Sequence, residues 1–187
     1  IIEPDVFEDL RGFFMETYHR DKYRELGIAV EWLQDNLAFS RRAVLRGMHL
    51  QHPQDQAKLV QVLQGEVFDV VVDVRFGSPT FGGWTGEVLS ASNQRQMFVP
   101  AGFAHGYCVL SETALFHYKC SQLYAPRHEM GVLWADPDLG IDWPVKNPLV
   151  SGKDAALPRL KEIPEEDLPT YRSKGPRSRS SAVKISW

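Results

Sequence analysis

Short apolar runs separated by turn-forming residues dominate the chain from Val44 onward. Gly, Pro, Asn and Ser interrupt these runs about every eight to twelve residues, a spacing typical of an antiparallel sandwich or barrel. The clearest run covers residues 66–74, where β-branched residues favour a strand. Its alternation predicts one face with Asp69 and Asp73, and another with Phe68, Val70, Val72 and Val74.

The same pattern predicts further strands at residues 58–63, 84–89, 96–99, 105–110 and 114–120. Turn-forming segments at residues 77–79 and 100–102 separate some of them. Because no long helical pattern lies between these strands, a parallel sheet built from βαβ units is excluded. The pattern leaves a jelly roll, an immunoglobulin-like sandwich and an up-and-down barrel open.

The two ends of the chain are less regular. Residues 1–6 are expected to be extended, and residues 21–26 are expected to form a short helix that ends at Gly27. A second short helix is expected near residues 158–167. After Tyr171 the sequence is rich in Ser, Arg and Lys, which predicts a single domain over residues 1–171 and a basic, mobile tail over residues 172–187.

Composition narrows the class of protein. A chain of 187 residues with 43% hydrophobic and 24% charged residues is expected to form one globular core. The net charge of −3 gives no basic surface for nucleic acid. No apolar run is long enough to cross a membrane and no secretory leader precedes the first strand, so we expect no membrane partner and a cytoplasmic location. Cys108 and Cys120 lie in apolar stretches without metal-ligand spacing, which predicts buried thiols.

His49 is the first candidate for chemistry, because two cations lie near it in the sequence. Arg46 precedes it by three residues and Lys58 follows it by nine. Strict strand alternation places Arg46 and His49 on opposite faces, but Gly47 offers a bulge that can redirect one of them. A lone histidine in a strand is otherwise more often a structural residue.

Other candidates have structural explanations as well. His105 lies in a Pro-x-Gly-x-x-His pattern that resembles the second motif of metal-binding cupins, but the partner His-x-His motif is missing, so no metal site is expected. Tyr118 alternates with Ala114 and Phe116, which suits a core aromatic residue. Asp154 by itself suits a surface turn.

Taken together, these segments resemble the dTDP-4-dehydrorhamnose 3,5-epimerase family, over residues 1–156 and in one order. The segments are Arg11-Gly12-Phe13-Phe14-Met15-Glu16, Gln34-Asp35-Asn36, Val44-Leu45-Arg46-Gly47-Met48-His49, Lys58-Leu59-Val60, residues 65–75, Ser78-Pro79-Thr80-Phe81-Gly82, Pro100-Ala101-Gly102-Phe103-Ala104-His105-Gly106, Tyr118-Lys119-Cys120-Ser121, Tyr124-Ala125-Pro126, Asp136-Pro137, Asp142-Trp143-Pro144 and Ser151-Gly152-Lys153-Asp154. The resemblance implies an all-β, cupin-type antiparallel jelly roll with short peripheral helices.

The resemblance also implies a reaction and roles for the candidates. His49 is expected to be the general base, oriented by Asp154, and Tyr118 the general acid on the opposite face of a 4-keto sugar. Lys58 and Arg46 are expected to stabilise the enolate that forms between the two proton transfers. Neither a cofactor nor a metal is implied.

The remaining expected contacts concern the nucleotide. Arg11, Phe14, Glu16, Gln34 and Asn36 are expected to surround it, partly across the interface of a homodimer, with Arg11 pairing with the diphosphate. Tyr124 is expected to pack near the nucleotide or the sugar, and His105 to form a polar wall of the pocket. The expected substrate is a dTDP-linked 4-keto-6-deoxysugar.

Two departures from the family pattern leave the regiochemistry open. Leu37 and Ala38 stand where many members carry a polar pair, and Gln122-Leu123 replaces a segment that often includes a further Tyr. Epimerisation at both C3 and C5 is favoured over reaction at C3 alone. A non-catalytic sugar-nucleotide-binding cupin and a metal-dependent cupin are the alternatives from other classes.

Overall fold

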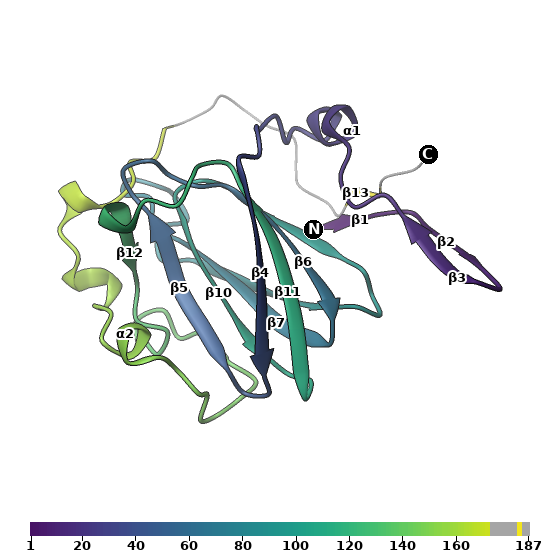
Figure 1. The fold of residues 1–187 in the computed structure, drawn as a ribbon. Helices are drawn as coiled ribbons and strands as arrows, with labels where there is room; N and C mark the ends of the chain where they lie inside the picture. The colour runs from purple at the N-terminus through teal and green to yellow at the C-terminus, as the bar shows by residue number, and fades with distance from the viewer. Residues whose placement is uncertain (173–182, 185–187) are drawn as a thin grey trace.

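The computed structural model describes residues 1–172 and 183–184, and within them the chain forms two β-sheets packed against each other (Figure 1). The strands are β1 Ile2–Glu3, β2 Val6–Asp9, β3 Gly12–Met15, β4 Gln34–Arg41, β5 Leu45–Gln51, β6 Lys58–Gln64, β7 Glu66–Asp73, β8 Trp84–Ser90, β9 Gln96–Val99, β10 Phe103–Val109, β11 Thr113–Cys120, β12 Glu129–Gly131 and β13 Val183–Lys184. The helices are α1 Arg20–Glu25 and α2 Gly152–Ala155, with 3₁₀ turns η1 Pro126–His128, η2 Leu160–Glu162 and η3 Glu165–Asp167.

The larger sheet has the strand order β13-β1-β9-β6-β11-β4, and the smaller sheet the order β12-β5-β10-β7-β8. All strand pairs in the two sheets are antiparallel except β1 with β13. Strands that are distant in sequence, such as β5 and β10, are neighbours in space. This arrangement confirms the predicted jelly roll with short peripheral helices. The hairpin of β2 and β3 extends away from the body (Figure 1).

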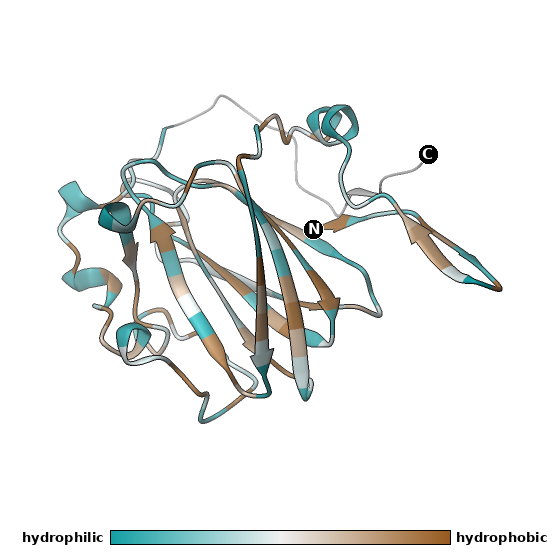
Figure 2. Cartoon of the chain, in the orientation of Figure 1, coloured by the Kyte–Doolittle hydropathy of each residue, from teal (hydrophilic) through white to brown (hydrophobic). Residues whose placement is uncertain are grey.

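The main core lies between the two sheets. Val60, Val62 and Phe116 from the larger sheet pack against Val67 and Val71 from the smaller sheet, and all five are buried. Burial of each such side chain contributes about 1.5–3 kcal/mol, so this layer fixes the distance between the sheets. Figure 2 shows the apolar residues along the strands of the body, whereas α1 is mainly hydrophilic.

Strand β7 is buried on both faces. Val70 and Val72 pack in a second cluster with Leu160 and Leu168 of the C-terminal segment, on the face opposite Val71. The predicted alternation is therefore present, but the face that carries Asp69 and Asp73 is also closed to solvent. Buried carboxylates need hydrogen-bond donors, and both have them.

Two expectations about helices have different outcomes. The predicted helix before Gly27 is confirmed as α1, which buries Tyr23 and ends where Gly27 takes a φ of 86°. The helix predicted near residues 158–167 is wrong, because the segment forms the separate turns η2 and η3 with Pro164 between them. The predicted basic tail lies outside the described residues except for Arg172 and β13.

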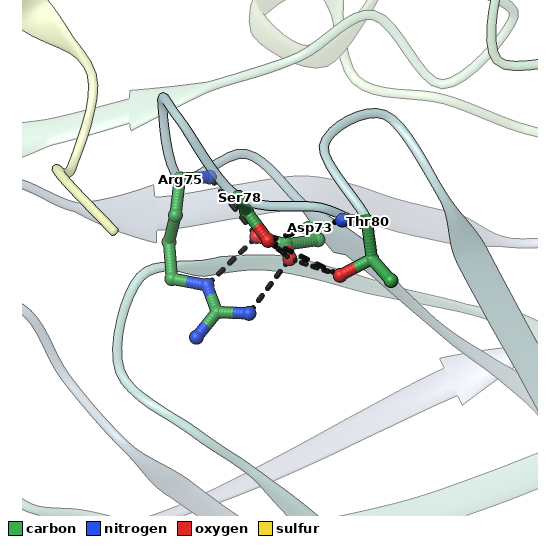
Figure 3. Close-up of polar contacts among 4 residues, drawn as sticks. All are labelled: Asp73, Arg75, Ser78 and Thr80. Carbon is green, nitrogen blue, oxygen red and sulfur yellow. Dashed lines mark hydrogen bonds and ion pairs between the residues drawn. The ribbon is translucent and has the colours of Figure 1, made fainter. Parts of the chain in front are cut away.

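Asp73 organises the turn between β7 and β8 (Figure 3). Its carboxylate accepts hydrogen bonds from Arg75 Nε at 2.8 Å and Nη2 at 2.7 Å, from Ser78 Oγ at 2.6 Å and from Thr80 Oγ1 at 2.7 Å. Burial by itself raises the pKa of Asp73, but these hydrogen bonds outweigh it and lower the pKa to about 2. The Arg75 guanidinium also lies 5.1 Å from the ring of Tyr171, so the cluster ties the C-terminal segment to this turn.

Asp73→Asn is expected to reduce the free energy of unfolding at pH 7 by about 2–4 kcal/mol, because Arg75 loses its buried anion. The folded-state pKa lies below the ordinary value of 3.8, so the carboxylate stabilises the fold above about pH 4, and this contribution of about 2 kcal/mol is lost as the pH falls towards 2. Urea titrations at pH 7 and pH 3 measure both effects. Asp138→Asn, at an exposed ion pair with Lys161, is the control. Equal losses in the two variants would contradict the assignment.

Candidate active site

A cavity of about 620 Å³ opens between the two sheets next to α2. Its polar lining comes from both sheets and from α2 with its capping residue: Arg46, His49, Lys58, His105, Tyr107, Tyr118, Glu129, Ser151, Lys153 and Asp154. A smaller adjoining cavity of about 330 Å³ shares His49, Lys58, Tyr118 and Glu129, and adds Gln34, Asn36, Cys120 and Tyr124. The structure thus brings most of the residues expected from the sequence into two connected cavities.

Gly47 explains how Arg46 and His49 both reach the larger cavity. His49 pairs with His105 and Arg46 pairs with Tyr107, so β5 carries one more residue than β10 over this interval. Such a bulge reverses the alternation beyond it. Gly47 has a φ of 139°, and a Cβ atom there would lie 2.6 Å from Gly106 Cα, so this position requires glycine. The bulge suggested by the sequence is therefore present.

His49 and Asp154 form a hydrogen-bonded pair although 105 residues separate them in sequence. His49 Nε2 lies 2.8 Å from Asp154 Oδ1, and Gly47 N donates to Asp154 Oδ2 at 3.2 Å. Ser151 Oγ accepts from Asp154 N and caps α2, which places the carboxylate in the interior. Because a carboxylate only accepts, Nε2 carries the proton and Nδ1 is the basic nitrogen. Asp154 is 4% exposed, so its interpretation as a surface turn is wrong.

The electrostatics of His49 favour the neutral imidazole. Burial lowers the pKa of His49 below its ordinary value of 6.5, and the charge of Lys58 acts in the same direction. The hydrogen bond and the charge of Asp154 oppose this effect, as does the charge of Glu129. The result is a base that is unprotonated at neutral pH but has a carboxylate ready to stabilise its protonated form.

Lys58 and Tyr118 face the cavity from the larger sheet. Lys58 is 9% exposed, and burial lowers its pKa. Among the described residues, none forms a hydrogen bond or ion pair with its ammonium group. Burial raises the pKa of Tyr118 to about 12, so its hydroxyl remains protonated and can donate a proton or a hydrogen bond.

His105 belongs to a second histidine–carboxylate pair that the sequence reasoning missed. Its Nε2 lies 3.0 Å from both oxygens of Asp69, which is fully buried. The only signal in the sequence was a charged residue inside the apolar run of residues 66–74. The pair holds the ring of His105 stacked on Phe116 in the wall of the larger cavity.

Glu129 was also missed. It lines both cavities, and its Oε2 accepts hydrogen bonds from Tyr124 Oη at 2.6 Å and Lys153 Nζ at 2.7 Å. Partial burial raises the pKa of Glu129, but its partners outweigh this effect and keep the pKa below its ordinary value. Glu129 is therefore a carboxylate at neutral pH.

Three expected nucleotide-binding residues lie outside both cavities of the single chain. Arg11 and Phe14 are exposed on the hairpin of β2 and β3, where Arg11 bonds to Asp9. Glu16 follows this hairpin and pairs with Lys22 at 3.0 Å. Gln34 and Asn36, in contrast, lie in the smaller cavity, joined by a hydrogen bond of 2.9 Å.

Two other kinds of site are absent from the described residues. None of the helices there has the length and apolar character needed to cross a membrane. Across residues 1–172 and 183–184, no three His, Cys, Asp or Glu side chains are grouped so that they could hold a metal ion.

The jelly roll and its internal acid–base site define the class, which is that of cupin-fold sugar-nucleotide epimerases. A family model described as dTDP-4-dehydrorhamnose 3,5-epimerase matches residues 1–162. The chain belongs to this family.

Relatives and solved structures agree with this assignment. The dTDP-4-dehydrorhamnose 3,5-epimerase of Pseudomonas aeruginosa is 56% identical over 82% of this chain and 86% of its own length, and that of Methanothermobacter thermautotrophicus is 48% identical over 88% and 90%. The crystal structure of a dTDP-6-deoxy-D-glucose-3,5-epimerase from Legionella pneumophila, in complex with dTDP-4-keto-L-rhamnose, superposes with a TM-score of 0.89 at 50% identity. It covers 91% of this chain, and 92% of the Legionella chain is matched.

Asp154→Asn is expected to lower the pKa of His49 further, because the carboxylate that stabilises the imidazolium is lost while burial and Lys58 continue to act. An NMR titration of the His49 ring measures the change. His117 is an internal control, since its pKa is lowered by burial and by the charge of Lys119, which together outweigh the opposing charge of Asp35. An unchanged or raised pKa of His49 would contradict the pairing.

Proposed function

We propose that this protein converts dTDP-4-dehydro-6-deoxy-D-glucose into dTDP-4-dehydro-L-rhamnose by inverting C3 and C5. The observation that carries the proposal is the placement of the His49–Asp154 pair and Tyr118 around one cavity. The related Legionella enzyme was crystallised with dTDP-4-keto-L-rhamnose, which is the expected product. The reaction class is that of an isomerase whose steps need no cofactor.

The 4-keto group makes the hydrogens on C3 and C5 acidic, so each inversion needs a base on one face of the ring and an acid on the other. His49 Nδ1 removes the proton, and Asp154 stabilises the resulting imidazolium through Nε2. Tyr118 Oη returns a proton to the opposite face. Between these steps Lys58, together with Arg46, stabilises the negative charge on the ketone oxygen.

The smaller cavity suits the nucleotide end of the substrate. Gln34 and Asn36 supply amides there, and Tyr124 supplies an aromatic surface. His105 forms a polar wall on the sugar side. We place the diphosphate near the junction of the two cavities, within reach of Arg46 and of Arg11 from a second protomer.

We include a second protomer because the hairpin of β2 and β3, which carries Arg11 and Phe14 and is followed by Glu16, extends away from the body of its own chain (Figure 1). A homodimer in which each hairpin completes its partner's nucleotide site gives these residues a function. The outer face of the larger sheet supports such an association, since Leu37, Phe39 and Leu63 are 61%, 54% and 48% exposed there. Apolar patches of this kind commonly mark protein interfaces.

The proposal also covers the extent of the catalytic domain and the cellular location of the protein. Residues 1–171 form the catalytic domain, and no role is assigned to residues 172–187. Cys108 and Cys120 are both buried and unpaired, in keeping with a reducing cytoplasm.

Incubation with dTDP-4-dehydro-6-deoxy-D-glucose in deuterated water tests the reaction. NMR is expected to show deuterium at C3 and C5, and L-rhamnose after a reductase is added. Deuterium at C3 alone would identify a mono-epimerase, and no incorporation would favour a binding role.

His49→Ala is expected to slow incorporation of deuterium about 100- to 10 000-fold, because the base is lost. Tyr118→Phe should retain deuterium exchange into substrate that is not inverted, because the base remains while the acid is lost. His128→Ala, outside both cavities, is the matched control.

Phe39→Asp is expected to dissociate the dimer, because the substitution places a charge in the proposed apolar interface. Multi-angle light scattering after size-exclusion chromatography measures the mass. Val88→Asp, at an exposed apolar position on β8 of the other sheet, should leave the dimer intact. A monomeric wild-type protein would refute the proposed assembly.

A further inference from the structure

Glu129 forms the wall between the two cavities. It begins β12 directly after the turn η1, and its side chain is 20% exposed. The same oxygen, Oε2, accepts from Tyr124 Oη at 2.6 Å and from Lys153 Nζ at 2.7 Å. One carboxylate therefore links the segments of Tyr124 and Lys153, which are about thirty residues apart in the sequence.

These two segments serve opposite ends of the site. Lys153 directly precedes Asp154 in α2, a helix of four residues that cannot hold its position through its own backbone bonds. Tyr124 lies in the loop before β12, and its backbone N–H donates to Gln34 Oε1 at 2.8 Å in the smaller cavity. Glu129 thus connects the helix that carries the catalytic carboxylate with the loop beside the nucleotide cavity.

We propose that Glu129 is a positioning residue, which through Lys153 holds α2 in the place where Asp154 orients His49. The link to Tyr124 extends this support to the loop on the nucleotide side, so that a nucleotide packed against Tyr124 stabilises the same arrangement of α2. The kinetic part of this inference rests on the proposed epimerase function. The structural part concerns only the His49–Asp154 hydrogen bond.

Lys153→Met tests the ion pair without touching Glu129, Asp154 or His49. Loss of the ion pair is expected to lower kcat about 3- to 10-fold. Because Lys153 also lines the larger cavity, a change in KM would report a lost substrate contact and is measured separately. Lys153→Arg keeps the charge and should restore most of kcat. The matched control is Lys161→Met: Lys161 pairs with Asp138 at 2.7 Å and is 59% exposed, against 62% for Lys153. A kcat within twofold of wild type in Lys153→Met would overturn the proposal.

A double-mutant cycle shows whether Glu129 is the partner through which Lys153 acts. Glu129→Gln also removes a charge near His49, so it is expected to have the larger effect by itself. Adding Lys153→Met to Glu129→Gln should then lower kcat only slightly further. Fully additive losses would refute the role of Glu129.

A measurement without substrate separates this inference from the proposed function. The ¹⁵N shifts of the His49 ring report which nitrogen carries the proton, and the wild-type protein is expected to hold it on Nε2. In Lys153→Met the ring should become a mixture of tautomers, and in Lys161→Met it should not. An unchanged tautomer would overturn the inference even if deuterium exchange establishes the epimerase. A mixed tautomer would support it even if the substrate proves to be different.

Discussion

The carboxylate of Asp154 is the constraint on which the rest of the site depends. Its two oxygens bind different partners, since Oδ1 accepts from the ring of His49 and Oδ2 from the backbone of Gly47. The first bond selects the basic nitrogen, and the second holds the bulge that turns Arg46 and His49 towards the same cavity. A carboxylate on α2 thus holds the geometry of β5, although 105 residues separate Asp154 from His49 in the sequence. The His49–Asp154 pair therefore depends on the bulge that turns His49 towards the cavity.

Burial then sets the chemistry of the groups around this dyad. The pKa values of His49 and Lys58 are lowered and that of Tyr118 is raised to about 12, in each case mainly because solvent is excluded. The His49 ring is thereby neutral and the Tyr118 phenol protonated, which are the states that the proposed mechanism requires before the first proton transfer. An enolate formed beside Lys58 would relieve the cost of burying that cation. This is why electrostatic stabilisation is expected to be large in a cavity that excludes water.

The strand-rich fold and most of the site could both be predicted from the sequence, but from different kinds of signal. Alternation and turn spacing predicted β6 to β11, because these strands are short apolar runs bounded by turn-forming residues. The strand β4 was missed because its outward positions include Leu37 and Phe39, which obscure the contrast between its faces. Asp154 could not be found from local pattern, since its importance comes from a long-range hydrogen bond. The resemblance to a family supplied it, whereas Asp69 and Glu129 required the structure.

The two-sheet architecture also explains why the proposed base and the proposed acid face each other. His49 and His105 project from the smaller sheet, while Lys58 and Tyr118 project from the larger one. Facing sheets lie about 10 Å apart, so in the proposed mechanism a sugar ring between them would have one face towards His49 and the other towards Tyr118. Inversion by removal and return of a proton on opposite faces needs this separation. The packing of Val60, Val62 and Phe116 against Val67 and Val71 fixes it, so the hydrophobic core sets the spacing on which the proposed chemistry depends.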